Sequence, residues 1–324
     1  MSGEDRVIAR YFRPLARAPG AFGLTDDAGV LEPPPGCDVV LKTDPIIAGV
    51  HFFPDDPPDA VARKALRVNL SDLAAKGAIP AGFLLALALP ASIPEHWLAQ
   101  FAQALGDDAD RYQCPLLGGD TDATPGLLTV SITAFGLVPH GTMVLRSGAK
   151  VGDQVVVSGT VGDAALGLRL RRAPPSGAVP IGLEHLLARY QIPEPRTGLA
   201  PTLRRYASAA MDISDGLAGD LAKLCRASGV SAQIHTTQLP LSDAARSMLD
   251  ADPGLLDTVL TGGDDYEVLC TIPSARLADF RGASAATGIA VTVIGQVVAG
   301  SADPRFIDAR GEPRAFERPS FSHF

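Results

Sequence analysis

The sequence predicts an α+β protein of two α/β-type domains, and three observations lead to this fold class. The chain has 324 residues, a length typical of two domains of ordinary size. Hydrophobic residues make up 46% of it, enough for a large buried core. Strands, a Gly-Gly-Asp turn and a helix start marked by Ser-Asp occur in both halves. We therefore expect one domain at residues 1–140 and another at 141–324, meeting in the loop-rich stretch 139–153.

The charge balance restricts the partners of the protein. The formal net charge is -8, which argues against a nucleic-acid surface because such a surface needs a basic patch. An anionic substrate would need cations or local Arg and Lys residues in order to bind. The uncharged stretch 77–94 is interrupted by Gly and Pro, so it indicates a buried strand with flanking loops and not a membrane span.

Cysteine usage and the N-terminus predict a cytoplasmic protein. The four cysteines form no CxxC motif and no close pair, which is typical of a reduced protein and makes a zinc site improbable. The first residues, MSGEDRVIARYF, are mixed in charge and contain no apolar region, so they do not resemble a signal peptide.

The elements of the first half follow from local patterns. Helical spacing and apolar runs predict helices at 4–16, 58–68 and 94–112 and strands at 38–44, 83–89 and 127–138. In the last of these strands, apolar residues alternate with Thr and Ser, which indicates a strand with one polar face.

Two Ser-Asp pairs predict helix starts. In LRVNLSDLAAK (66–76), Ser71 is expected to cap a helix and Asp72 to lie in its first turn, where the helix dipole favours an anion. MDISDGLAGDLAKL (211–224) has Ser214 and Asp215 in the same places. Either pair alone is most simply an ordinary cap. The alternative is that both carboxylates face one site.

The second half is expected to contain similar elements. We predict a strand, glycine turn and helix within 153–170, helices at 182–191 and 198–208, a helix that ends at Gly229, and strands at 231–237 and 288–298.

Glycine pairs predict two turns that project carboxylates. Gly118 and Gly119 would allow a tight turn and a close backbone approach to a ligand, with Asp120 following them. The stretch 260–273 repeats the pattern, with GGDD before a strand.

Six aspartates are expected at strand ends, turns or helix starts: Asp27, Asp44, Asp72, Asp120, Asp212 and Asp215. Mg²⁺ prefers oxygen ligands and takes one or two carboxylates together with phosphate oxygens. Several ions held around one polyphosphate would serve phosphoryl transfer, whose chemistry consists mostly of positioning and charge neutralisation. The sequence contains no P-loop, no protein-kinase motif and no Ser-His-Asp or Cys-His arrangement. The alternative is that all six are ordinary acidic caps.

Eight segments resemble the thiamine-monophosphate kinase family, in order and along nearly the whole chain. They are TDDAGVL (25–31), KTDPIIAGVHF (42–52), KALRVNLSDLAAKGA (64–78), GGDT (118–121), RSGAKVGD (146–153), VSGTVGDAALGL (157–168), MDISDGLAGDL (211–221) and GGDDYEVL (262–269). The resemblance implies ATP-dependent phosphorylation of thiamine phosphate to thiamine diphosphate, by direct in-line transfer with several Mg²⁺ ions. It also implies a homodimer in which N-terminal mixed sheets pair, and an active site completed by the C-terminal domain.

The resemblance also implies roles for individual residues. Its metal ligands fall on Asp27, Thr43, Asp44, Asp72, Asp120, Asp212 and Asp215, of which Asp72, Asp120 and Asp212 are expected to be catalytic. Its nucleotide contacts fall on Gly119, Arg146 and Ser214. Its substrate contacts fall on His51, Asp264 and Phe321.

Four positions depart from the family pattern, and one of them is Thr25, which replaces a common Gly. Lys42 stands where the family often has Thr or Ser as a metal ligand, and an ammonium group cannot ligate a metal. Our hypothesis is that Lys42 meets a phosphate directly in place of one cation. Asp264 stands where Glu is usual, and Ala102 stands where an aromatic residue usually faces adenine.

Two other functions remain open at this point. One is a different ATP-dependent enzyme of the same superfamily, such as a ligase similar to aminoimidazole-ribonucleotide synthetase. The other is a nucleotide-binding regulator without catalytic activity.

Overall fold

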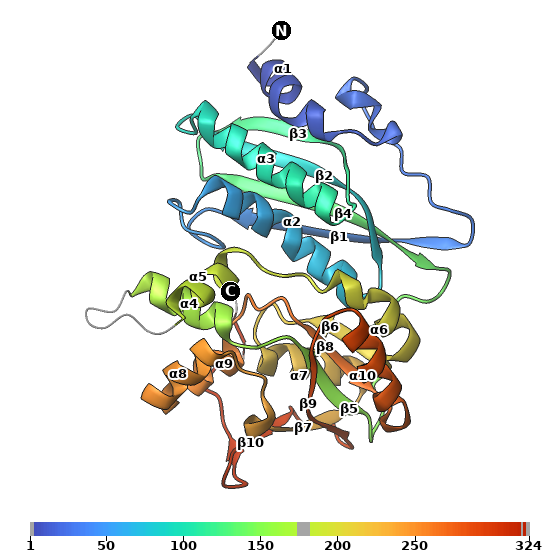
Figure 1. Ribbon diagram of the computed structural model, residues 1–324, viewed down its shortest axis with the longest axis vertical. Coiled ribbons are helices and arrows are strands. Elements are labelled where there is room, and N and C mark those ends of the chain that lie inside the picture. Colours follow the sequence, from blue (N-terminus) through green and yellow to red (C-terminus); the bar gives the residue numbers. More distant parts are fainter. Residues whose placement is uncertain (1–2, 174–181, 319, 322–324) are drawn as a thin grey trace. The chain divides into compact units, whose positions relative to one another are not determined.

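Two mixed β-sheets, each with its own helices, organise the chain (Figure 1). The computed structural model describes residues 3–173, 182–318 and 320–321. One compact unit comprises the residues up to 73 together with 78–142, and the other comprises 74–77 and the residues from 143 onwards. This architecture confirms the predicted α+β class. The short stretch 74–77 belongs with the second unit, and no local pattern in the sequence predicted this.

The first unit places two long helices on one face of a four-stranded sheet (Figure 1). Its strands are β1 (Cys37–Ile47), β2 (Ile79–Pro90), β3 (Leu116–Thr124) and β4 (Thr129–Pro139), and its helices are α1 (Gly3–Val7), α2 (Pro58–Ala75) and α3 (Glu95–Arg111). The strand order is β1-β4-β2-β3, in which β2 and β3 are parallel and the other neighbours are antiparallel. A π-helical turn (Ile8–Phe12) and 3₁₀ turns (Arg13–Leu15 and Pro19–Leu24) follow α1.

The alternation predicted for residues 127–138 is confirmed in strand β4. In β4 the residues Val130, Ile132 and Ala134 are buried, whereas Thr129, Ser131 and Thr133 are partly exposed. Because side chains of a strand point alternately to the two faces, one face of this sheet packs on the helices and the other remains open.

Helix α2 corrects the prediction for the first Ser-Asp pair. It runs without a break from Pro58 to Ala75, so Ser71 and Asp72 lie inside it and Ser71 is not an N-cap. After Pro58 this stretch contains neither Gly nor Pro, and its buried residues continue past Ser71, so nothing stops the helix before Gly77. Ser71 is itself buried.

The first glycine pair is also placed differently from the prediction. Gly118 and Gly119 lie within strand β3 and do not form a turn. A Cβ atom at Gly119 would stand 1.9 Å from the carbonyl oxygen of Leu85 on the neighbouring strand β2. The glycine is therefore required by the close approach of two strands.

The second unit is built on a seven-stranded sheet with the order β11-β10-β7-β9-β5-β8-β6. Its strands are β5 (Gln154–Ser158), β6 (Ala209–Asp212), β7 (Ser231–His235), β8 (Val268–Ile272), β9 (Val291–Val298), β10 (Arg305–Ile307) and β11 (Pro313–Arg314). Its helices are α4 (Asp163–Arg172), α5 (Leu183–Gln191), α6 (Ala200–Tyr206), α7 (Leu217–Ser228), α8 (Asp243–Ala251), α9 (Leu256–Thr261) and α10 (Leu277–Ala286). The predicted strand, turn and helix within 153–170 are confirmed as β5 and α4.

Both faces of the seven-stranded sheet are covered. Val155 and Val157 of β5 join one apolar cluster with residues of α4 and α7, whereas Val156 joins a second cluster with residues of α6 and α10. The run of three buried valines thus supplies both cores, as expected for a strand with helices on both sides. Within the described part of the chain, no helix is long and apolar enough to cross a membrane.

A buried ion pair joins α2 to α3 in the first unit. Arg67 donates from Nε to Oδ2 of Asp108 at 2.6 Å and from Nη2 to Oδ1 at 3.0 Å. Arg67 is 2% exposed and Asp108 is fully buried. Removing one member of such a pair leaves an uncompensated charge in the interior.

We predict that Asp108→Ala lowers the free energy of unfolding by about 3–5 kcal/mol, because the buried guanidinium of Arg67 then loses the carboxylate that balances its charge. Asp110→Ala on the same helix is the matched control, since the Asp110–Arg17 pair is largely exposed and should contribute about 0–1 kcal/mol. Urea unfolding followed by circular dichroism measures both variants. Equal losses for the two variants would contradict this account.

Candidate functional site

The first unit brings two predicted metal ligands, Asp44 and Asp72, around one lysine. The Lys42 ammonium lies 3.1 Å from Oδ2 of Asp44 and 2.8 Å from Oδ2 of Asp72. Lys42 and Asp44 come from strand β1 and Asp72 comes from the last turn of α2, which packs on that face of the sheet. The continuous helix, and not a cap, therefore positions the Asp72 carboxylate.

In this cluster the charges of the two carboxylates affect Lys42 more than its partial burial does. Partial burial alone would lower the pKa of Lys42, but the neighbouring Asp72 carboxylate, followed by Asp44, outweighs it and raises that pKa. Lys42 is therefore protonated at neutral pH and serves as the counterion of both carboxylates. The exposed fractions of 28% for Lys42, 37% for Asp44 and 15% for Asp72 show that the cluster is open to solvent and to solutes.

A pocket of about 630 Å³ lies in the same unit, between the N-terminal segment and strands β2, β3 and β4. Asp27, Gly119 and Asp120 line it together with apolar side chains such as Phe12 and Phe135. Thr133 also lines the pocket, and its hydroxyl donates to Oγ1 of Thr43 at 3.1 Å. A cavity of this size with a few convergent polar groups is typical of a small-molecule site.

The strand order separates the pocket from the lysine cluster. Asp44 lies on β1 and Asp120 on β3, which are opposite edges of the sheet. Three strand spacings of roughly 4.8 Å place these edges about 14 Å apart. Asp44 and Asp120 of one chain therefore cannot bind the same ion. Within the described residues, no group of three or more His, Cys, Asp and Glu side chains is placed to hold a metal.

The second unit gathers predicted residues around the loop that precedes α7. Asp212 ends strand β6, and Ser214 and Asp215 follow it. The Ser214 carbonyl accepts from the N–H of Asp264 at 2.9 Å, and the Asp215 carbonyl accepts from the N–H of Phe321 at 3.0 Å. The chain thus brings Asp212, Ser214, Asp215, Asp264 and Phe321 together, although they come from three separate segments.

The second Ser-Asp pair does not cap its helix in the predicted way. Helix α7 begins at Leu217 after Gly216, and the carboxylate of Asp220 in its first turn accepts from the N–H of Ser214 at 3.0 Å and of Asp215 at 2.9 Å. A side chain inside the helix therefore holds the preceding loop. Burial raises the pKa of Asp220, and Lys223, which contacts Asp220 at 2.8 Å and also Asp215, opposes that shift.

Two residues of the loop before β8 have left-handed backbone conformations. Asp264 has φ of 71° and Tyr266 has φ of 51°, a region that non-glycine residues enter only when their surroundings impose it. The Tyr266 hydroxyl donates to Oδ1 of Asp264 at 3.3 Å, and the Tyr266 N–H donates to the carbonyl of Ile213. The candidate substrate residue Asp264 is therefore fixed by its own loop.

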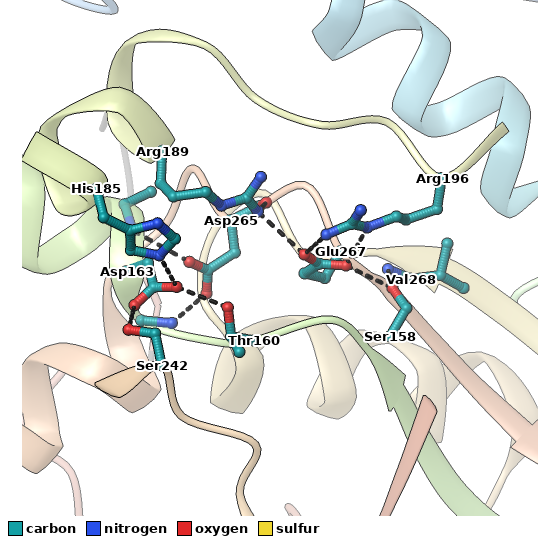
Figure 2. Close-up of polar contacts among 12 residues, drawn as sticks. Ser158, Thr160, Asp163, His185, Arg189, Arg196, Ser242, Asp265, Glu267 and Val268 are labelled. Carbon is teal, nitrogen blue, oxygen red and sulfur yellow. Dashed lines mark hydrogen bonds and ion pairs between the residues drawn. The ribbon is translucent and has the colours of Figure 1, made fainter. Parts of the chain in front are cut away.

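A buried network that the sequence analysis missed holds this loop in place (Figure 2). Glu267 is fully buried and accepts from Arg189 at 3.0 Å, from Nε of Arg196 at 2.7 Å and from the Ser158 hydroxyl at 2.6 Å. A Cβ atom at Gly159 would stand 2.2 Å from a Glu267 oxygen, so the glycine makes room for the carboxylate. Glu267 is the last residue of the motif GGDDYE, but its partners Arg189 and Arg196 lie 78 and 71 residues away in the chain.

Asp265 binds the start of helix α4 in the same network (Figure 2). Its carboxylate accepts from the N–H of Gly162 at 2.7 Å and of Ala164 at 3.4 Å. Complete burial raises the pKa of Asp265 well above its usual value, although the Gly162 N–H opposes the shift. The predicted glycine turn before α4 is thus held by the second GGDD aspartate.

Three predicted residues lie away from these clusters. Nδ1 of His51 accepts from the N–H of Ile47 at 3.1 Å, so the neutral ring carries its proton on Nε2. Arg146 is exposed, and its carbonyl accepts from Ser228 at the last residue of α7, the end opposite to Ser214. Ala102 is 4% exposed within α3 and belongs to the core, so it faces no ligand pocket.

The donor chemistry of both units fits Mg²⁺. The predicted aspartates of the two units lie singly or in pairs. Mg²⁺ usually takes one or two carboxylates and completes its octahedron with water and phosphate oxygens. Asp44 and Asp72 are the clearest pair, because their oxygens already converge on one cation.

Comparisons with known proteins place this geometry in context. The family model described as AIR synthase related protein, N-terminal domain, matches residues 25–138, and the corresponding C-terminal domain model matches 150–306. A thiamine-monophosphate kinase of Caulobacter vibrioides is 44% identical over 90% of this chain and 83% of its own length. A crystal structure of thiamine-monophosphate kinase from Stenotrophomonas maltophilia superposes with a TM-score of 0.84 at 36% identity, covering 96% of each chain. The structure of AaThiL complexed with AMPPCP and TMP superposes with a TM-score of 0.79 at 30% identity, covering 94% of this chain and 97% of that one.

We predict that Asp265→Asn changes the pH dependence of stability. A carboxyl whose folded-state pKa is raised contributes stability below its unfolded pKa of about 3.9 and loses that contribution as the pH rises through the folded pKa. Relative to the wild type, the variant should therefore become progressively more stable as the pH rises from about 4 towards 8. Urea unfolding across this range measures the difference. Asp279→Asn, an exposed change in the same unit, is the control, and curves parallel to the wild type for both variants would refute the prediction.

Proposed function

The chain belongs to the family of thiamine-monophosphate kinases, and we propose that it transfers the γ-phosphoryl group of ATP to thiamine phosphate. The products are thiamine diphosphate and ADP. The observation that carries the proposal is the match of both units, over nearly the whole chain, to a relative whose structure contains AMPPCP, an analogue of ATP, together with TMP. Kinases named for this reaction are also 39–44% identical over most of the chain.

The chemistry needs no general base. A phosphate oxygen of thiamine phosphate attacks the γ-phosphorus of ATP in line, the new P–O bond forms, and the bond to the β–γ bridging oxygen breaks as ADP leaves. The nucleophile is already ionised near neutral pH because the second pKa of a phosphomonoester is about 6. When bound, several Mg²⁺ ions would neutralise the phosphates and align them. The remaining task of the protein is to hold two anionic groups together.

The first unit supplies the following groups in this proposal. Asp44 and Asp72 would hold one metal, whereas Thr43, whose side chain lies on the other face of β1 and contacts Thr133, would act from the side of the pocket. Asp27 and Asp120 form a second metal-binding group in the pocket, beside Gly119. The apolar part of the pocket, which includes Phe12 and Phe135, is suited to a nucleotide base, and it replaces the aromatic contact that Ala102 cannot make.

The second unit supplies the remaining groups. Asp212 and Asp215 act as metal ligands, and Ser214 and Arg146 contact the nucleotide. Asp264 and the ring of Phe321 contact thiamine phosphate, the ring by stacking on the thiamine heterocycle. His51 of the first unit also contacts thiamine phosphate in this proposal. Ser214, Asp215, Asp264 and Phe321 are joined by backbone hydrogen bonds, which supports a shared role.

The open face of the four-stranded sheet supports a homodimer. Val39, Leu137 and Ile79 are directly paired across β1, β4 and β2, and Leu41 lies on the same face of β1, two residues from Val39. Leu41 is 67% exposed and Ile79 is 44% exposed, and a row of large apolar side chains exposed on one face of a sheet typically marks an interaction surface. We propose that the same face of a second copy covers this row.

The cysteines support a reducing, cytoplasmic location. All four are free, and burial raises the pKa of Cys114 and Cys270 to about 12 and of Cys225 to about 11. These thiols are therefore structural and unreactive.

A direct assay separates this function from the two alternatives. The protein is mixed with MgATP and thiamine phosphate, and ADP and thiamine diphosphate are measured. ADP formed only with aminoimidazole precursors would favour a ligase of the same superfamily, and tight ATP binding without turnover would favour a regulator.

We predict that Asp72→Asn lowers kcat/KM by at least about 100-fold, because one oxygen of the metal-binding pair is replaced by an amide that cannot bear the charge. Steady-state kinetics at saturating Mg²⁺ measure the effect, and circular dichroism verifies the fold. Asp59→Asn, an exposed change on the same helix, is the matched control. Unchanged activity in Asp72→Asn would count against the proposed site.

We predict that Leu41→Glu converts the dimer to a monomer, because a charge on the face that the second copy covers would be buried without a partner. Sedimentation velocity measures the mass. Leu127→Glu alters a similarly exposed leucine outside the paired strands and should leave the dimer intact. A wild-type protein that sediments as a monomer would overturn the proposed assembly.

A further inference from the structure

In each unit one lysine bridges two carboxylates that include predicted metal ligands. Lys42 contacts Asp44 at 3.1 Å and Asp72 at 2.8 Å. Lys223 contacts Asp215, and it contacts Asp220 at 2.8 Å. Of the two, Lys42 is the more informative, because both of its partners are assigned to metal binding.

The ammonium group of Lys42 occupies the position in which a divalent cation would bind the same oxygens. Two carboxylates that converge on one point repel each other unless a cation lies between them. Lysine supplies a compact point charge on a flexible stem, so it can hold the pair without fixing it permanently. A metal that takes both oxygens must first displace the ammonium, since an ammonium has no lone pair with which to share the metal.

Charge counting indicates what would displace it. The three side chains sum to -1 when Lys42 is charged, so a dication added to the intact cluster would leave the half-buried group at +1. A nucleotide that binds together with the metal brings negatively charged phosphate oxygens, and the displaced Lys42 ammonium can pair with them. Metal binding should therefore be weak alone and strong together with nucleotide.

We propose that Lys42 is a positioning residue that holds Asp44 and Asp72 together in the metal-free enzyme and moves to the nucleotide phosphates when the metal takes its place. This inference rests on the proposed function, because it takes Asp44 and Asp72 as metal ligands. It explains how an ammonium can stand among metal ligands, and it makes Lys42 the source of coupling between metal and nucleotide.

The test is a titration of the full-length protein with Mn²⁺, in which free ion is measured by electron paramagnetic resonance, with and without AMPPCP. Without nucleotide, Lys42→Met should bind Mn²⁺ about tenfold more tightly than the wild type, because the competing charge is gone. Adding AMPPCP should tighten Mn²⁺ binding more in the wild type than in the variant. Arg10→Met, which removes one exposed positive charge from the same unit, should match the wild type.

Two further variants test whether the gain in Mn²⁺ affinity depends on Asp44 and provide a replacement if Lys42→Met does not fold. Adding Asp44→Asn to Lys42→Met should abolish the gain in Mn²⁺ affinity. Lys42→Thr provides a shorter neutral side chain if the Met variant does not fold. Thermal melts give a second measurement: without divalent ions the neutral variants should melt below the wild type, and Mn²⁺ should raise their Tm more than that of the wild type.

The inference is overturned if the neutral variants bind Mn²⁺ no more tightly than the wild type, or if AMPPCP tightens Mn²⁺ binding equally in all of them. Its failure is distinguishable from failure of the proposed function, because the titration contains no thiamine phosphate. Normal turnover with unchanged Mn²⁺ affinities would refute the role of Lys42 alone. The expected affinities without phosphoryl transfer would refute the kinase and leave the role of Lys42 intact.

Discussion

The convergence of Asp44 and Asp72 on the ammonium of Lys42 is the interaction on which this account of the protein depends. A chain with a net charge of -8 repels a nucleotide and a phosphomonoester, and those two ligands repel each other. Cations placed between the carboxylates and the phosphates would reduce both of these repulsions. The structure contains one such cation as part of the chain itself, at the place where the proposed reaction would need a metal.

The two units prepare their carboxylates by different means. In the first unit, regular structure does so: strand β1 and the uninterrupted helix α2 present Asp44 and Asp72 to the same ammonium group. In the second unit, irregular loops do so, and their strained residue Asp264 is held by the buried anion of Glu267 and its arginines. A loop fixed by a buried charge network is pre-organised for binding, since little conformational freedom remains to be lost.

The sequence predicted the fold class and most of the long elements, because apolar periodicity and glycine signals are local. It failed where a local signal was overridden by tertiary context. Ser71 resembles a cap, but the apolar face of α2 continues past it, and the paired strands leave no room for a side chain at Gly119 although the GGD motif resembles a turn. The network around Glu267 could not be predicted, because its partners Arg189 and Arg196 are distant in sequence and lie in an unremarkable stretch. The acidic residues themselves could be identified from the sequence. Their division between opposite edges of one sheet could not, because it depends on the strand order.

A crystal structure of this chain with Mg²⁺, AMPPCP and thiamine phosphate tests the central claim most directly. The account predicts metal ions between the phosphates and the carboxylates of Asp44 and Asp72, with the Lys42 ammonium on a phosphate oxygen. A structure in which the nucleotide is bound while Lys42 still bridges the two carboxylates, with no metal on either, would contradict it.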